Sequence, residues 1–249
     1  GNRELDYRRF FDIDSLAALR VEDPEVFFAT HELVLGWVRD GVLDGLRIDH
    51  PDGLREPRRY LERLRRRAPE GWLIVEKILE PDEALRVSWP VSGTTGYDFL
   101  NDVGGVFIDP AGETPLTHLY QDVRGGCPPW ESVVREKKLL VLEEVLAADL
   151  NRLTHLFVQV CEGNRRFRDF TRHELREALR EVAVSLPVYR TYVEEDGQAE
   201  DADREVLREV FQEVRDRGAE IAPELLGFLR DILTGERGKP GDREAELRM

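Results

Sequence analysis

Apolar residues in the first hundred positions are spaced as in helices in some segments and as in strands in others, and the two kinds of segment alternate along the chain. Residues 26–38 place them at helical spacing after the Asp23-Pro24 cap, and residues 43–48 form a short apolar run typical of a strand. The order then repeats, with a proline-initiated helical pattern from Pro57 and a second apolar strand over 72–75. The succession helix, strand, helix, strand favours a parallel sheet with helices packed against it.

The pattern changes after about residue 110. A break rich in glycine and proline at 125–129 precedes a long helical pattern from Trp130 to about Val160. Further helices are predicted from the capping box Thr171-x-x-Glu174, over about 203–217 and over about 223–234. We therefore expect an α/β fold: a partial (β/α)8 TIM-barrel segment followed by a mainly α-helical domain. Residues 1–110 are predicted to be the central part of the barrel, and residues 111–249 a helical domain attached to it or inserted in it.

Two acidic residues directly follow the predicted strands. Asp49 ends the run Asp-Gly-Leu-Arg-Ile-Asp, and Glu76 ends the run Trp-Leu-Ile-Val-Glu 27 positions later. In a (β/α)8 barrel of roughly 250 residues, successive strand ends are about 31 residues apart, so this spacing is close to one repeat. Because the chemistry of such barrels is located at the C-terminal strand ends, both carboxylates are candidate catalytic groups.

Two carboxylates at neighbouring strand ends suit cleavage of a glycosidic bond. One attacks or stabilises the anomeric carbon and the other transfers a proton, and a retaining reaction needs them about 5–5.5 Å apart. Arg47 is two residues before Asp49, so in a strand its side chain shares the same face and favours an ionised Asp49. Glu76 is then the proton donor, provided that an apolar neighbour such as Trp72 favours its protonated form.

An ordinary charged surface is the competing interpretation of these residues. The chain has 51 acidic residues, so an ion pair at one strand end, or a surface pair of Glu76 and Lys77, would carry no function. The joint occurrence of two acids in matching contexts at two strand ends favours a site.

The same residues resemble a known family. Asp44 to Asp49 resembles the strand-four motif of the α-amylase superfamily (glycoside hydrolase family 13), and Ile74 to Glu76 resembles its strand-five motif. Four longer strings in this order resemble the maltooligosyltrehalose synthases within that superfamily: Tyr7 to Asp12, Asp44 to Leu54, Val75 to Leu79 and Gly93 to Phe99.

The resemblance implies a role for each motif residue. Asp49 would be the nucleophile, Glu76 the general acid/base and Arg47 the group that orients the nucleophile. The side chains expected near the bound sugar are His50, Lys77, Tyr97, Trp89 and Tyr7. For Tyr7 and Trp89, ordinary packing is an equally good interpretation.

The resemblance also implies a reaction. A (1→4)-α-D-glucan 1-α-D-glucosylmutase converts the reducing-end α-1,4 linkage of a maltooligosaccharide to α,α-1,1 by a retaining double displacement, a step of trehalose biosynthesis. An amylase-like hydrolase or a 4-α-glucanotransferase has the same catalytic pair and is one alternative. A catalytically inactive glucan-binding fragment is another.

One departure from the superfamily pattern favours a segment of a longer enzyme. The superfamily has a third catalytic Asp, usually in a His-Asp pair. The five histidines here are followed by Glu32, Pro51, Leu119, Leu156 and Glu174, so the sequence contains no such pair. We therefore expect this chain to be the middle of a longer protein whose remaining barrel segments are its partners.

Composition restricts the other function classes. The net charge of −15 argues against a nucleic-acid partner and is compatible with a neutral glucan. No apolar run approaches the roughly 20 residues of a membrane span, and no signal peptide is evident, so a cytoplasmic enzyme is expected. Cys127 and Cys161 are expected to be reduced thiols. No metal and no cofactor are expected, because no second histidine or cysteine lies at ligand spacing from His50.

Overall fold

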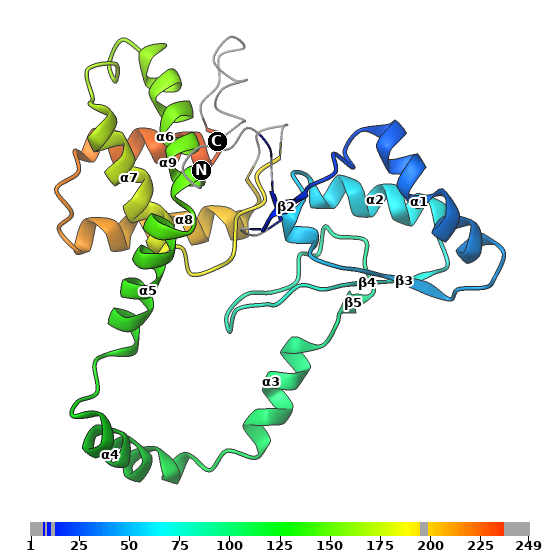
Figure 1. Cartoon of the computed structure of the whole chain (residues 1–249), viewed down its shortest axis with the longest axis horizontal. Coiled ribbons are helices and arrows are strands. Elements are labelled where there is room, and N and C mark those ends of the chain that lie inside the picture. The colour runs from blue at the N-terminus through cyan, green and yellow to red at the C-terminus, as the bar shows by residue number, and fades with distance from the viewer. Residues whose placement is uncertain (1–6, 8, 11–12, 195–198, 237–249) are drawn as a thin grey trace. The chain divides into compact units, whose positions relative to one another are not determined.

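The computed structural model describes residues 7, 9–10, 13–194 and 199–236, and it divides into two compact units (Figure 1). The sheet unit comprises residues 19–133, and the helical unit comprises residues 1–18 together with 134–249. The division by contacts therefore falls near residue 133. The boundary at 110 between a barrel part and a helical domain stays a prediction.

The sheet unit contains a small parallel sheet with the strand order β3-β4-β5. Its strands are β3 (Gly45–Ile48), β4 (Trp72–Val75) and β5 (Gly93–Thr94). Its helices are α1 (Pro24–Arg39), the 3-10 helix η1 (Pro51–Gly53), α2 (Pro57–Arg67), α3 (Tyr97–Val106), the 3-10 helix η2 (Pro110–Gly112) and α4 (Glu113–Arg124). The predicted order of helices and strands and the parallel pairing are confirmed.

Helices α1 and α2 lie along one face of this sheet (Figure 1). The Asp23 side chain accepts a hydrogen bond from the Glu25 N–H at 2.8 Å and Pro24 occupies the first turn, so α1 begins where the sequence predicted. The residues of this unit that are fully buried are Phe27, Leu61, Leu64, Leu73 and Val75. In β4 the buried positions alternate, which leaves the other face, with Ile74, less covered.

At Gly45, strand β3 lies directly against the backbone of β4. A Cβ atom at this position would lie 2.3 Å from the carbonyl oxygen of Trp72, which is backbone and cannot rotate away. We expect Gly45→Ala to lower the free energy of unfolding by about 1–3 kcal/mol, because the two strands must separate to admit the methyl group. Chemical denaturation followed by circular dichroism measures this loss.

Gly104→Ala is the matched control, because Gly104 lies in α3 and a Cβ there would meet no atom within 4 Å. It should leave stability unchanged or raise it by up to about 1 kcal/mol through its better helix propensity. Equal effects of the two substitutions would contradict the close approach at Gly45.

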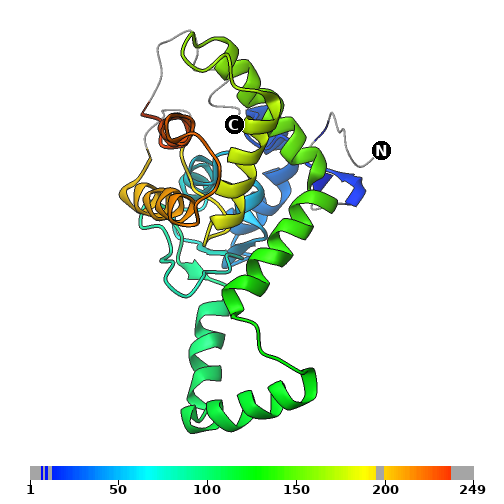
Figure 2. The ribbon, with the colours of Figure 1, turned by 90° about the vertical axis from the view of Figure 1, so that its left-hand side faces the viewer.

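The helical unit is built around one apolar core. Its elements are the antiparallel strands β1 (Arg9–Phe10) and β2 (Ile13–Ala17), most of α5 (Trp130–Glu144), α6 (Ala147–Glu162), α7 (Arg172–Ser185), α8 (Asp201–Asp216) and α9 (Pro223–Leu233). Helix α7 packs against α6, α8 and α9 (Figure 2). The core includes Phe157, Leu175, Leu207, Phe211 and Leu229. The predicted capping box is confirmed, since Thr171 and Glu174 each bond the backbone N–H of the other.

The predicted long helical pattern over 130–160 is two helices, so a continuous helix is a wrong interpretation there. The N–H groups of Val145 and Leu146 both donate to the Val141 carbonyl, at 2.9 Å each. This shared acceptor ends α5, and α6 begins at Ala147 with its own buried face. Apolar periodicity continued across the break, so the sequence pattern did not reveal it.

No helix within the described residues is both long enough and apolar enough to cross a membrane. Cys127 is exposed and Cys161 is buried, and neither forms a disulfide. Burial raises the pKa of the Cys161 thiol to about 12, so this sulfur is a protonated core group.

Candidate active site

The parallel pairing of β3 and β4 continues to the two predicted acids. Every registered pair, from Gly45 with Trp72 to Ile48 with Val75, is 27 positions apart, and so are Asp49 and Glu76. The Glu76 N–H donates to the Ile48 carbonyl at 2.8 Å, so the ladder extends to the residue after β4. Paired strands lie about 4.8 Å apart, so the two acids are neighbours at one edge of the sheet.

The Arg47 side chain contacts Asp49 directly. Its guanidinium donates to Asp49 Oδ1 at 2.7 Å, and both side chains are exposed. An exposed pair of this kind contributes only about 0.2–1 kcal/mol to stability, so its main effect is on orientation. The hydrogen bond holds one carboxylate oxygen and leaves the other free of this contact, which suits a carboxylate that must attack a carbon atom.

The Glu76 carboxylate is held by the backbone of His50. Glu76 Oε2 accepts a hydrogen bond from the His50 N–H at 3.0 Å. His50 adopts a left-handed conformation, with φ 46° and ψ 54°, which is uncommon for a residue with a side chain. A Cβ atom on Gly53 would lie 2.6 Å from His50 Cδ2, so the His50 ring occupies space that only glycine leaves open.

This backbone contact was missed by the sequence reasoning, which assigned His50 a sugar contact through its ring. A main-chain donor depends on the local φ and ψ, and the residue type does not specify them. The next three residues, Pro51 to Gly53, form the 3-10 turn η1. The role of the His50 ring toward a sugar stays a prediction.

Lys77 points into the sheet unit. Its side chain is 2% exposed, and its ammonium lies 3.3 Å from Asp52 Oδ2 and 2.8 Å from Glu83 Oε1. Both carboxylate side chains are 8% exposed. We call these three residues the Lys77 cluster. The predicted contact between Lys77 and a sugar therefore needs correction, because the ammonium is directed to buried partners and away from solvent.

Three aromatic residues were predicted to lie at the site, and they differ in their exposure to solvent. Trp89 is 5% exposed, so its ring packs within the sheet unit, as the competing interpretation expected. Tyr97 is exposed at the first position of α3, three positions after the end of β5. Tyr7 is also exposed and belongs to the helical unit. The sugar contacts of Tyr97 and Tyr7 stay predictions.

The loop before Tyr97 is ordered by a local hydrogen bond. The Thr94 hydroxyl donates to Asp98 Oδ1 at 2.6 Å, and the Gly96 N–H donates to the same hydroxyl at 3.1 Å. The hydroxyl bond to Asp98 holds the pKa of that carboxyl below its usual range. The turn that begins α3 at the edge of the sheet is therefore fixed by its own side chains.

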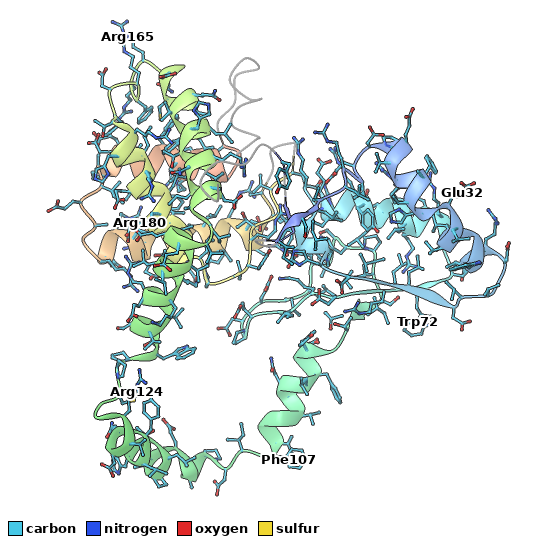
Figure 3. The ribbon with its side chains drawn as sticks, viewed as in Figure 1. Glu32, Trp72, Phe107, Arg124, Arg165 and Arg180 are labelled. Carbon is cyan, nitrogen blue, oxygen red and sulfur yellow. The ribbon has the colours of Figure 1, made fainter. Side chains whose placement is uncertain are left out.

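Trp72 does not lie beside Glu76. It occupies the first position of β4, where Figure 3 labels it, and lies four positions before Glu76, or about 13 Å along the strand. Trp72 is 63% exposed. The apolar wall that we expected Trp72 to provide is therefore absent from this end of the strand.

The described residues contain no group of three or more histidine, cysteine, aspartate or glutamate side chains that could hold a metal ion. What they bring together is two carboxylates on adjacent strand ends, with a guanidinium on one and a backbone donor on the other. This arrangement can perform nucleophilic and acid/base chemistry on a substrate that lies across the strand ends.

We compared the chain with known proteins. No family model matches the chain. Two curated relatives, both described as putative maltooligosyl trehalose synthases of Mycobacterium tuberculosis, are 47% identical over 148 residues. The match covers 59% of this chain and 19% of each relative.

The chain is also similar to solved structures of maltooligosyltrehalose synthases. The maltooligosyltrehalose synthase from Arthrobacter ramosus is 35% identical with a TM-score of 0.80, and the match covers 99% of this chain and 30% of that one. A hypothetical maltooligosyl trehalose synthase from Sulfolobus tokodaii is 30% identical with a TM-score of 0.67, over 94% of this chain and 29% of that one. The chain thus spans less than a third of the length of these relatives, and it is similar to one part of the maltooligosyltrehalose synthases, as its motifs predicted.

Proposed function

We propose that this segment supplies the nucleophile and the general acid/base of an enzyme that converts the reducing-end α-1,4 linkage of a maltooligosaccharide to an α,α-1,1 linkage. The observation that carries the proposal is the register of β3 and β4, which makes Asp49 and Glu76 neighbours. Strand spacing alone sets their backbones about 4.8 Å apart. A covalent, retaining mechanism requires its two carboxyl groups to lie about 5–5.5 Å apart, and side chains on backbones this close can reach that separation.

In the first step, Glu76 donates a proton to the oxygen of the last α-1,4 bond. The bond between that oxygen and the anomeric carbon breaks as Asp49 attacks the carbon from the opposite face. The products are a glycosyl ester on Asp49 and a free glucose. The hydrogen bond from Arg47 fixes one oxygen of the Asp49 carboxyl group, which orients the group for this attack.

In the second step, Glu76 is a base. It removes the proton of the anomeric hydroxyl of the retained glucose, and that oxygen attacks the glycosyl carbon as the ester bond to Asp49 breaks. Two inversions give net retention, so an α,α-1,1 linkage forms and Glu76 is protonated again. The glucose must stay bound between the steps, because its effective concentration has to exceed that of water as an acceptor.

The barrel and the third catalytic acid belong to the same proposal. We place β3, β4 and β5 in a (β/α)8 barrel whose other strands and further acid come from the rest of a longer protein. Residues 111–249 belong to the proposal as a helical domain attached to this barrel or inserted in it. Tyr97, exposed after β5, is the aromatic side chain that we assign to the sugar site.

Incubation of the complete enzyme with maltohexaose tests the proposal, with reducing ends and chain lengths measured in the same samples. We expect reducing ends to disappear while chain length stays constant. An increase in reducing ends would indicate a hydrolase, and a redistribution of chain lengths with constant reducing ends would indicate a 4-α-glucanotransferase. No change in either quantity would indicate a glucan-binding protein. Each of these three results would contradict the mutase.

A further inference from the structure

The Lys77 cluster connects the two chain segments that follow the catalytic strands. Asp52 lies three residues after Asp49, in the η1 turn beyond β3, whereas Lys77 and Glu83 lie in the segment beyond β4. We propose that Lys77 is a positioning residue, which acts through this cluster to hold Glu76 in place beside Asp49. The expected effect on turnover rests on the proposed function.

Burial makes the cluster a rigid connection. The Lys77 side chain is 2% exposed, so its ammonium has lost most of its hydration. Moving either carboxylate away would leave a buried charge without its partner, which is strongly destabilising. The Lys77 ammonium also lies 3.4 Å from the Ile78 carbonyl. Glu83 is fixed in its own turn, since Glu83 Oε2 accepts a hydrogen bond from the Glu80 N–H at 3.2 Å. The cluster therefore ties together two turns of fixed shape.

The η1 turn transmits this constraint to Glu76. Asp52 is two residues from His50, whose N–H donates to Glu76 Oε2, and Gly53 makes room for the His50 ring. A shift of Asp52 would displace η1 and the His50 N–H with it. On the other strand, Lys77 is covalently next to Glu76. The cluster thus fixes the donor and the acceptor of the same hydrogen bond from both sides.

A positioning role predicts a specific change in kinetics. In the complete enzyme, Lys77→Met should lower kcat about 10–100-fold, because a displacement of about 1 Å of a catalytic group has this effect. KM for maltohexaose should change less than about threefold, since the three side chains of the cluster are buried and paired with one another. A role in sugar binding would raise KM.

The double variant Lys77→Met/Glu83→Gln separates positioning from stability. Lys77→Met alone leaves Glu83 as a buried carboxylate without this cation, and the second substitution removes that charge. We expect the thermal midpoint of the double variant to recover above that of Lys77→Met, whereas its kcat stays low. Recovery of kcat together with the midpoint would overturn the proposal. If Lys77→Met does not fold, kcat and the thermal midpoint of Glu83→Gln and of the double variant are compared with those of the wild type instead. A wild-type kcat in both variants would overturn the positioning role.

Arg135→Met/Glu181→Gln is the matched control. Arg135 and Glu181 form an ion pair in the helical unit, where the Glu181 side chain is as buried as those of Asp52 and Glu83. This control should lower the thermal midpoint and leave kcat at the wild-type value. A kcat loss in the control equal to that in Lys77→Met/Glu83→Gln would mean that any buried ion pair affects turnover, and would overturn the specific role.

Hydrogen exchange at the His50 amide tests the proposal without any activity. Exchange of this N–H should be at least about tenfold faster in Lys77→Met/Glu83→Gln than in the wild type or the Arg135→Met/Glu181→Gln control, because its bond to Glu76 is no longer held. Unchanged exchange would overturn the positioning role. A wild-type enzyme that makes no α,α-1,1 product would instead refute the proposed function, and the exchange result would still decide the role of Lys77.

Discussion

Asp49→Asn and Glu76→Gln, each made in the complete enzyme, should abolish conversion of maltohexaose while glucan still binds. Glu76→Gln removes both the acid of the first step and the base of the second, and general acid/base catalysis alone is worth about 10²- to 10⁴-fold. Asp49→Asn removes the nucleophile, so its loss should be at least about as large. Both amides keep the size of the carboxyl group. Steady-state kinetics and calorimetric titration with maltohexaose measure the two effects separately.

Two further variants make this prediction specific. The double variant Asp49→Asn/Glu76→Gln should be no slower than the slower single variant, because residues that act as one unit do not contribute additively. Asp44→Asn is the control, because Asp44 precedes β3 at the opposite end of the strand from Asp49. It should retain wild-type kcat. Near-normal turnover in either catalytic variant would refute the assignment of that residue.

Leu229→Ala should cause a large loss of stability in the helical unit. Leu229 lies in α9, is 0% exposed and belongs to the core that α6, α7 and α8 share. Its truncation removes buried apolar area and leaves a cavity, which costs about 2–5 kcal/mol of the free energy of unfolding. Denaturant unfolding of the chain, followed by far-ultraviolet circular dichroism, measures this value.

Leu140→Ala is the matched control, since it makes the same substitution in α5 at a side chain that is 45% exposed. Its cost should stay below about 1 kcal/mol, because much of its apolar area is already in contact with water. A similar loss for both leucines would contradict the difference in burial between them.

The arrangement of the sheet unit was predictable because two independent signals agree there. The Asp23 cap and the prolines at the starts of α1 and α2 mark helix starts, and short apolar runs mark β3 and β4. The break between α5 and α6 was not predictable from the same signals. It is made by backbone hydrogen bonds to Val141, in a stretch where apolar residues continue at helical spacing.

The positions of Asp49 and Glu76 were predictable because a parallel register follows from strand length and apolar pattern. The direction of Lys77 could have been predicted but was not. Consecutive residues of an extended chain point to opposite sides, so Lys77 faces away from the side that carries Glu76. The family motif contains both Glu76 and Lys77, and we therefore expected both side chains to lie near the bound sugar.

The left-handed backbone of His50 restricts which amino acids can occupy this position. Glycine, asparagine, aspartate and histidine adopt this conformation far more readily than valine or isoleucine. The choice of residue after Asp49 is therefore limited by backbone conformation, whatever the side chain at this position contacts. In a distant homologue, a histidine at this position would be consistent with the same turn, and a glycine or asparagine there would not argue against the same arrangement of Asp49 and Glu76.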